Sequence, residues 1–121
     1  MTRLERFYQE VREGRTMTPI PLDDPIPLEE LQTPALIIDL DILDANLAKM
    51  HKYLEPHGIR HRAHTKMHKC PIVAQRQIDA GATGVCAAKI SEAEVMCAAG
   101  IEDVLVTSPI ASLDKVVRFV Q

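Results

Sequence analysis

Aromatic residues are scarce in this sequence of 121 residues, which has no tryptophan and only two tyrosines and two phenylalanines. Proteins that bind single-stranded nucleic acid stack the bases on aromatic side chains. Positive charge is not in excess either, because 17 acidic residues outweigh 14 basic ones and the net charge is −3. Both features argue against a protein that binds nucleic acid.

Long apolar runs are also missing. The longest, residues 95–101, is far shorter than the ~20 residues that a membrane-spanning helix needs. The N-terminus has no apolar signal core, and its acidic residues are atypical of organelle transit peptides. The three cysteines are an odd number without C-x-x-C spacing, which indicates reduced thiols. We therefore expect a cytoplasmic protein without a membrane segment.

The first part of the chain, residues 1–32, predicts a separate N-terminal region. Four apolar residues recur at helical spacing and predict a short amphipathic helix: Leu4, Phe7, Tyr8 and Val11. Five of the eight prolines fall within residues 16–34. Proline fixes φ and removes a backbone donor, so this stretch predicts an extended arm.

Residues 33–121 show a regular alternation of short apolar runs and amphipathic segments. Strands are expected at residues 35–39, 59–64, 85–88 and 104–107. Between them, helices are expected from their caps and stops: from Asp41 to Gly58, from Pro71 to Gly81, from a Ser91–Glu94 capping box to Gly100, and after Ser112. Strands that alternate with helices predict parallel βαβ units.

The number of these units bounds the fold. A (β/α)8 barrel typically needs ~250 residues, and three parallel strands cannot cover both faces of their own sheet. We therefore predict an α/β fold, a partial (β/α)8 barrel that stops after about three βα units.

Basic residues gather in the middle of the chain. Residues 56–78 contain five lysines and arginines, four of the five histidines and no acidic residue. Such a cluster attracts an anion, for example the phosphate of a ligand or cofactor. A solvated basic surface has the same pattern, and the sequence leaves both interpretations open.

Lys66 has a special position in this cluster because it follows the strand expected at residues 59–64. In barrels and open α/β sheets, chemistry takes place at the carboxyl ends of the strands. Nearby Arg62 and Lys69 disfavour a further positive charge, which leaves more of Lys66 as free amine. Because a free amine forms a Schiff base with an aldehyde, Lys66 is the candidate catalytic residue.

Other kinds of site find less support. His64 and His68 are four residues apart and share a face only on a helix, but Pro71 indicates that the helix begins after them. Cys70 has no acidic neighbour that could orient a histidine partner. Neither G-x-G-x-x-G nor G-x-x-x-x-G-K-[ST] occurs. We therefore expect no metal ligands, no catalytic cysteine and no dinucleotide site in this sequence.

Residues 62–71, RAHTKMHKCP, resemble the R-P-H-x-K-T-H-K-x-P segment of the D-threonine aldolase and D-serine dehydratase family. These are pyridoxal-phosphate enzymes of fold type III, related to alanine racemase. Residues 33–41 with Asn46, residues 81–86 and residues 91–94 also agree in order and spacing. The resemblance covers roughly residues 33–110. It implies an alanine racemase-like barrel.

The resemblance also implies roles for single residues. Lys66 matches the lysine that holds pyridoxal phosphate as a Schiff base, and His64 and His68 match histidines with a supporting role near the cofactor. Ala63 and Met67 depart from the family pattern, which has proline and threonine there. Neither departure removes the reactive amine, so both bear on the degree of activity and on the subfamily.

Further features of the family lie later in the chain than these segments. They are the phosphate-binding residues, the ligands of a divalent metal and a β-rich second domain, with which we expect the strand at residues 33–40 to pair. A complete member works as a homodimer. We expect the 121 residues alone to be inactive.

The function that the resemblance implies is that of a lyase. An enzyme of the D-threonine aldolase type cleaves a D-3-hydroxy amino acid to glycine and an aldehyde. A D-serine dehydratase or an amino-acid racemase of the same fold would share all the residues discussed so far. A non-catalytic protein that binds pyridoxal phosphate for cofactor homeostasis is the alternative of another class, and an anion-binding scaffold without a cofactor is a third.

Overall fold

The computed structural model describes residues 26–120, in two units that divide between Ile37 and Ile38. The helix expected around residues 4–11 and the first part of the proline-rich arm lie outside the described residues. Within residues 26–37, the regular element is a single 3₁₀ turn, η1 (Leu28–Glu30).

The strand expected at residues 35–39 is not formed. These residues have no regular secondary structure, and Leu36, Ile37 and Ile38 are exposed. A strand exists only where a neighbour completes its hydrogen bonds, and none of residues 26–120 pairs with this segment. The pairing of this segment with a β-rich second domain, which the resemblance implies, stays a prediction.

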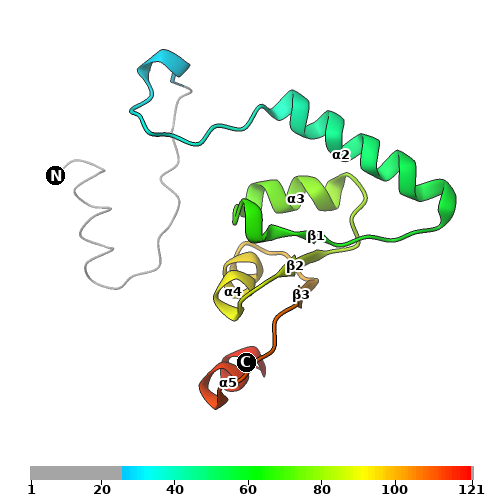
Figure 1. Ribbon diagram of the computed structural model, residues 1–121, viewed down its shortest axis with the longest axis vertical. Coiled ribbons are helices and arrows are strands. Elements are labelled where there is room, and N and C mark those ends of the chain that lie inside the picture. The colour runs from blue at the N-terminus through cyan, green and yellow to red at the C-terminus, as the bar shows by residue number, and fades with distance from the viewer. Residues whose placement is uncertain (1–25, 121) are drawn as a thin grey trace. The chain divides into compact units, whose positions relative to one another are not determined.

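A three-stranded parallel sheet forms the centre of the second unit (Figure 1). Its strands lie side by side in the order of the sequence: β1 (Ala63–His64), β2 (Val85–Ala87) and β3 (Val104–Val106). Ala63 pairs with Val85, and Val85 pairs with Val104. The predicted parallel βα order is confirmed.

The first strand is shorter than predicted, because β1 contains two residues where the sequence indicated residues 59–64. Its partner β2 begins only at Val85, after a turn that contains Gly81 and Gly84. The amide of Thr83 donates to the carbonyl of His61 at 3.0 Å, but this contact does not extend the ladder. The length of β1 is therefore set by the start of β2.

Helices follow each strand and precede the first. They are α2 (Leu40–Leu54), which continues into the 3₁₀ turn η2 (Glu55–His57), α3 (Pro71–Asp79), α4 (Ile90–Ala98) and α5 (Leu113–Val120). The predicted stops are confirmed, because Gly58, Gly81 and Gly100 all have positive φ angles. No described helix combines the length and the apolar character that crossing a bilayer requires.

Two predicted helix caps are wrong. Asp39, not Asp41, caps α2, and its carboxylate accepts a hydrogen bond from the Ile42 amide at 3.0 Å. A capping residue keeps an extended backbone outside the helix, whereas Asp41 already lies in the first turn. Ser91 likewise lies inside α4, which begins at Ile90.

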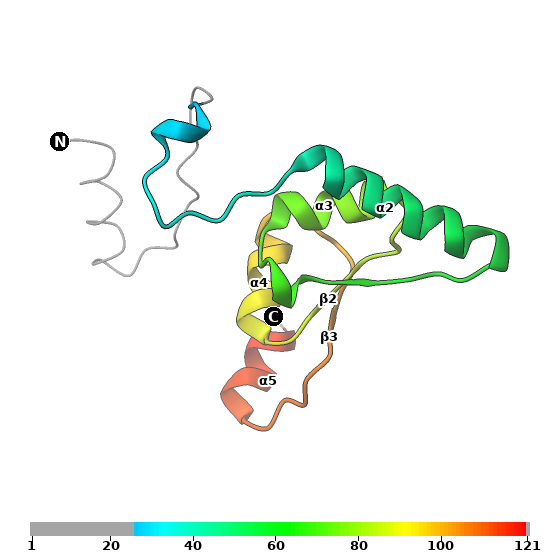
Figure 2. The ribbon, with the colours of Figure 1, turned by 45° about the horizontal axis from the view of Figure 1, so that its top comes forward.

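The core lies between one face of the sheet and two helices. Ala74 of α3, Val85 of β2 and Met96 of α4 pack together with Ile101, and Figure 2 shows both helices beside the strands. Side chains alternate along a strand, so Leu105 points to the opposite face, where it is 50% exposed. The helices therefore cover one face of the sheet and leave the carboxyl ends of the strands available for a functional site.

Candidate functional site at the carboxyl ends of the strands

Lys66 lies in a tight turn directly after β1. The turn consists of the 3₁₀ element η3 (Thr65–Met67) and ends at Pro71, the first residue of α3. The Lys66 side chain is exposed, and among residues 26–120 no carboxylate forms an ion pair with it. The predicted position just past the carboxyl end of β1 is confirmed.

His64, the other candidate, lies next to Lys66 and links the turn to the far strand. Its Nδ1 accepts a hydrogen bond from the Lys66 amide at 3.3 Å, and its Nε2 is 3.3 Å from Oγ1 of Thr107. Thr107 follows β3 and also donates to the Ala87 carbonyl at 3.2 Å. Nδ1 of His64 is an acceptor, and the Thr107 hydroxyl proton is already donated to the Ala87 carbonyl. These contacts therefore fit the His64 tautomer with the hydrogen on Nε2.

Thr65 holds the turn against β2 from the side of the core. It is fully buried, and its hydroxyl donates to the carbonyl of Cys86 at 3.0 Å. Its own carbonyl accepts from the Lys69 amide at 2.7 Å. Sequence reasoning missed both Thr65 and Thr107, because their partners are backbone carbonyls of other strands and leave no pattern near them in the chain.

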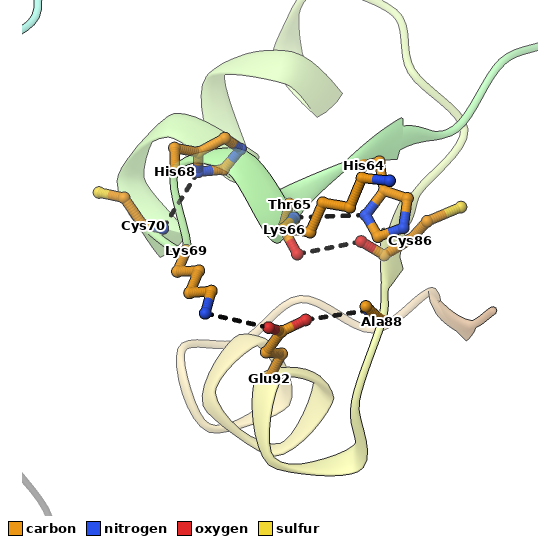
Figure 3. A network of polar contacts seen from close by, with 9 residues as sticks. All are labelled: His64, Thr65, Lys66, His68, Lys69, Cys70, Cys86, Ala88 and Glu92. Carbon is orange, nitrogen blue, oxygen red and sulfur yellow. Dashed lines mark hydrogen bonds and ion pairs between the residues drawn. The ribbon is translucent and has the colours of Figure 1, made fainter. Parts of the chain in front are cut away.

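His68 faces a different part of the molecule. Figure 3 shows its ring on the α3 side of the turn, whereas Lys66 extends on the His64 side. Its Nδ1 accepts from the Cys70 amide at 3.0 Å, just before α3 begins. Burial lowers the pKa of His68 below its usual value. The structure therefore does not bring His68 together with Lys66.

Three cations of the basic segment are paired with acids from outside it. Arg62 binds Asp103 at 2.6 Å, Lys69 binds Glu92 at 3.3 Å, and Arg76 binds Asp44 of α2 at 2.8 Å. The hydrogen bond from Arg62 lowers the pKa of Asp103. Arg62 and Lys69, whose positive charges were expected to act on Lys66, are therefore each paired with an acid.

A metal centre finds no support in the part of the chain that the structure describes. No three histidine, cysteine, aspartate or glutamate side chains gather there in a way that could hold a metal ion. His64 and His68, the pair with helical spacing, lie on different sides of the turn (Figure 3).

Comparison with known proteins places this site in a family. Residues 38–120, which contain all three strands and Lys66, match the family "Alanine racemase, N-terminal domain". The chain belongs to the alanine racemase N-terminal domain family. This match confirms the predicted α/β fold of the alanine racemase type.

Relatives within this family include aldolases and a dehydratase. The chain is 48% identical to a 3-hydroxy-D-aspartate aldolase of Paracoccus denitrificans over 74% of its own length and 24% of the relative's. It resembles the crystal structure of a D-threonine aldolase from Filomicrobium marinum with a TM-score of 0.75 and 46% identity, over 78% of this chain and 25% of that one. A D-threo-3-hydroxyaspartate dehydratase from Delftia sp. HT23 gives a TM-score of 0.65 and 40% identity, over 68% and 22%.

The chain thus spans about a quarter of the length of these alanine racemase-like relatives. The resemblance found in the sequence is confirmed by relatives named D-threonine aldolase, 3-hydroxy-D-aspartate aldolase and D-threo-3-hydroxyaspartate dehydratase.

Proposed function

We propose that this chain forms the lysine-bearing part of a pyridoxal-phosphate-dependent lyase of the D-threonine aldolase type. The reaction is the cleavage of a D-3-hydroxy amino acid to glycine and an aldehyde. The observation that carries the proposal is the exposed Lys66 in the turn after β1, within the segment that matches the family. The names of the relatives support the class of substrate.

The residues present fit the aldehyde end of the cofactor. Lys66 offers an exposed primary amine at the carboxyl edge of the sheet, and His64 stands beside it with hydrogen-bonding atoms on both sides of its ring. Lys66 would hold pyridoxal phosphate covalently, and His64 would lie next to it. When bound, the cofactor accepts electrons from the bonds around Cα of the amino acid.

The chain's own residues position the reactive amine. The His64 ring fixes the backbone amide of Lys66 and is itself oriented by the contact with Thr107. Thr65 fixes the same turn from the core side. The turn that carries Lys66 is thus held in place by contacts with all three strands. A fixed turn loses less conformational freedom when Lys66 forms the covalent link with the cofactor.

Other parts of the proposal lie beyond residues 26–120. A mutant of the related dehydratase has been solved in the metal-free form, and we propose a divalent metal for the whole protein, held by residues other than those described. A homodimer and a cytoplasmic location belong to the same proposal.

A dehydratase is the second candidate, because the Delftia relative carries that name at 43% identity over 75 residues. Cleavage releases glycine and an aldehyde, whereas dehydration releases ammonia and a keto acid. Incubating the complete protein with D-threonine and with D-3-hydroxyaspartate, and assaying glycine and ammonia, separates the two. Ammonia without glycine would overturn the aldolase proposal.

The assignment of Lys66 has its own test. Borohydride reduction of the complete protein loaded with pyridoxal phosphate, followed by peptide mass mapping, should place a pyridoxyl label on Lys66. Lys66→Ala should lack the label while the free energy of unfolding changes by less than about 0.5 kcal/mol, because the side chain is exposed.

Lys89→Ala is the matched control, since Lys89 also lies at the carboxyl edge, just before α4. This variant should keep the label on Lys66. A label on another lysine of the unmodified protein, or no label, would contradict the assignment.

A further inference from the structure

Glu92 connects the turn that carries Lys66 to two other elements. One of its carboxylate oxygens, Oε1, lies 3.3 Å from Nζ of Lys69, at the end of the turn. The other, Oε2, accepts the backbone amide of Ala88 at 3.0 Å, directly after β2. Glu92 itself belongs to the first turn of α4. A single carboxylate thus joins the Lys66 turn, the end of β2 and the start of α4 (Figure 3).

The acid of this ion pair is shielded more than the acids of the other pairs, whereas the Lys69 side chain is 62% exposed. The Glu92 side chain is 10% exposed, whereas Glu94, two residues on, is 45% exposed in its ion pair with Arg118. Burial raises the pKa of Glu92, but the Ala88 amide and Lys69 outweigh that effect and lower it overall. Glu92 is therefore a carboxylate at neutral pH, and its charge is less screened by solvent than that of an ordinary surface pair.

The backbone of Lys69 has a conformation that is unfavourable for lysine. Lys69 has a φ of 52°, the left-handed conformation that glycine and asparagine adopt readily and lysine does not. It is the one residue other than glycine with positive φ in the part of the chain that the structure describes. The backbone amide of Lys69 donates to the Thr65 carbonyl, as that of glycine would, and the lysine side chain adds an ammonium group for Glu92.

We propose that Glu92 is a positioning residue that acts through Lys69 to hold the Lys66 amine in place for the cofactor. Thr65 restrains the turn before Lys66, and the Lys69–Glu92 pair restrains it after Lys66. With both ends of the turn restrained, the backbone from which the Lys66 side chain extends is held in place. The inference rests on the proposed function, because it concerns the covalent link between Lys66 and pyridoxal phosphate.

The test compares two ligands that differ only at the reacting carbon. Pyridoxal phosphate has the aldehyde, and pyridoxine phosphate has an alcohol there and forms no link with an amine. Dissociation constants of both are measured on the complete apoprotein by calorimetry. The link itself is followed by borohydride reduction and peptide mapping.

Four variants distinguish the effect of losing the Lys69–Glu92 ion pair from general damage to the fold. Glu92→Gln keeps an oxygen for the Ala88 amide but removes the charge, and Lys69→Asn tolerates the positive φ but removes the cation. Lys69→Arg keeps the cation and should bind pyridoxal phosphate with the dissociation constant of the unmodified protein. Glu94→Gln is the control, an acid of the same helix whose partner is Arg118 of α5.

Glu92→Gln and Lys69→Asn should each raise the dissociation constant of pyridoxal phosphate by about three- to tenfold, the effect of losing a partly shielded ionic contact. The constant for pyridoxine phosphate should stay unchanged. Combining the two changes should cost no more than either alone, because both remove the same contact.

Two outcomes would overturn the inference alone. Either Glu92→Gln binds pyridoxal phosphate like Glu94→Gln, or both ligands weaken in parallel, which would mean general damage to the fold. An unmodified protein that forms no reducible link at Lys66 would overturn the proposed function, and this inference with it.

Discussion

Thr65 is the fully buried polar residue of the described chain, and it lies next to the reactive lysine. Its hydroxyl has one partner, the carbonyl of Cys86. A buried carbonyl without a partner costs free energy, so both members of this contact depend on each other. The side chain that supports Lys66 is thus also a component of the core.

Replacing Thr65 by valine should therefore destabilise the fold. Valine has nearly the same shape, so no cavity forms, but the Cys86 carbonyl loses its donor, and the free energy of unfolding should fall by about 1–3 kcal/mol. Urea denaturation followed by circular dichroism measures the change.

Thr65→Ser is the matched variant, because it keeps the hydroxyl and loses only a methyl group. It should lose about 1 kcal/mol, mainly through the small cavity. If valine were tolerated better than serine, the hydrogen bond would not be the reason for threonine at this position.

The start of α3 depends on an uncharged histidine. Nδ1 of His68 accepts from the Cys70 amide, in a helix start where Cys70 offers no side-chain cap. The accepting nitrogen cannot carry a proton, and burial already lowers the pKa of His68. Protonation therefore opposes the folded state at this helix end.

The sign of the pH dependence follows from this lowered pKa. Below the unfolded pKa of about 6.5 the unfolded chain takes up a proton that folded His68 does not, so stability falls as the pH drops until the folded pKa is reached. Urea midpoints at about pH 7.5 and 5.5, which bracket that value, should differ in the unmodified protein.

His68→Asn should reduce this difference, because the amide oxygen can accept the Cys70 proton but does not titrate. His57→Asn is the control, since His57 is exposed on the 3₁₀ turn η2 and lies far from α3 in the sequence. An equal loss of stability on acidification in His68→Asn and the unmodified protein would contradict the role of His68.

At the scale of the whole molecule, the basic segment is neutralised by acids that the fold supplies from elsewhere. Asp44 comes from α2, Glu92 from α4, and Asp103 immediately precedes β3. Each pair joins the segment to a different element. Three of the five cations in residues 56–78 thus take part in tertiary contacts, and Arg60 and Lys66 form no ion pair among residues 26–120.

Binding to a polyanion should reflect this pairing. The unmodified protein should elute from a heparin column at or below physiological ionic strength, about 0.15 M. A triple variant, Asp44→Asn, Glu92→Gln and Asp103→Asn, exposes three cations and should elute at higher salt.

The control is a triple variant with the same net charge. Glu29→Gln, Asp41→Asn and Glu102→Gln remove three carboxylates that form no ion pair among the described residues. Co-elution of the two triple variants would mean that net charge alone, and not the pairing, governs binding.

Local order was determined by the sequence alone. Pro71 starts α3, the glycines after η2, α3 and α4 have the positive φ that stops a helix, and the apolar runs at β2 and β3 form strands. These features depend on residues a few positions apart, where backbone sterics and side-chain periodicity act directly. The place of Lys66 after β1 follows from the same rules.

Only the tertiary structure decided which residues meet. The run at residues 35–39 has no partner strand among residues 26–120, and the length of β1 depends on where β2 begins. Thr65 meets Cys86, and Lys69 meets Glu92, across 21 and 23 positions, because the parallel register brings the strand ends together. Such contacts are set by strand pairing and helix packing, which no local pattern in the chain records.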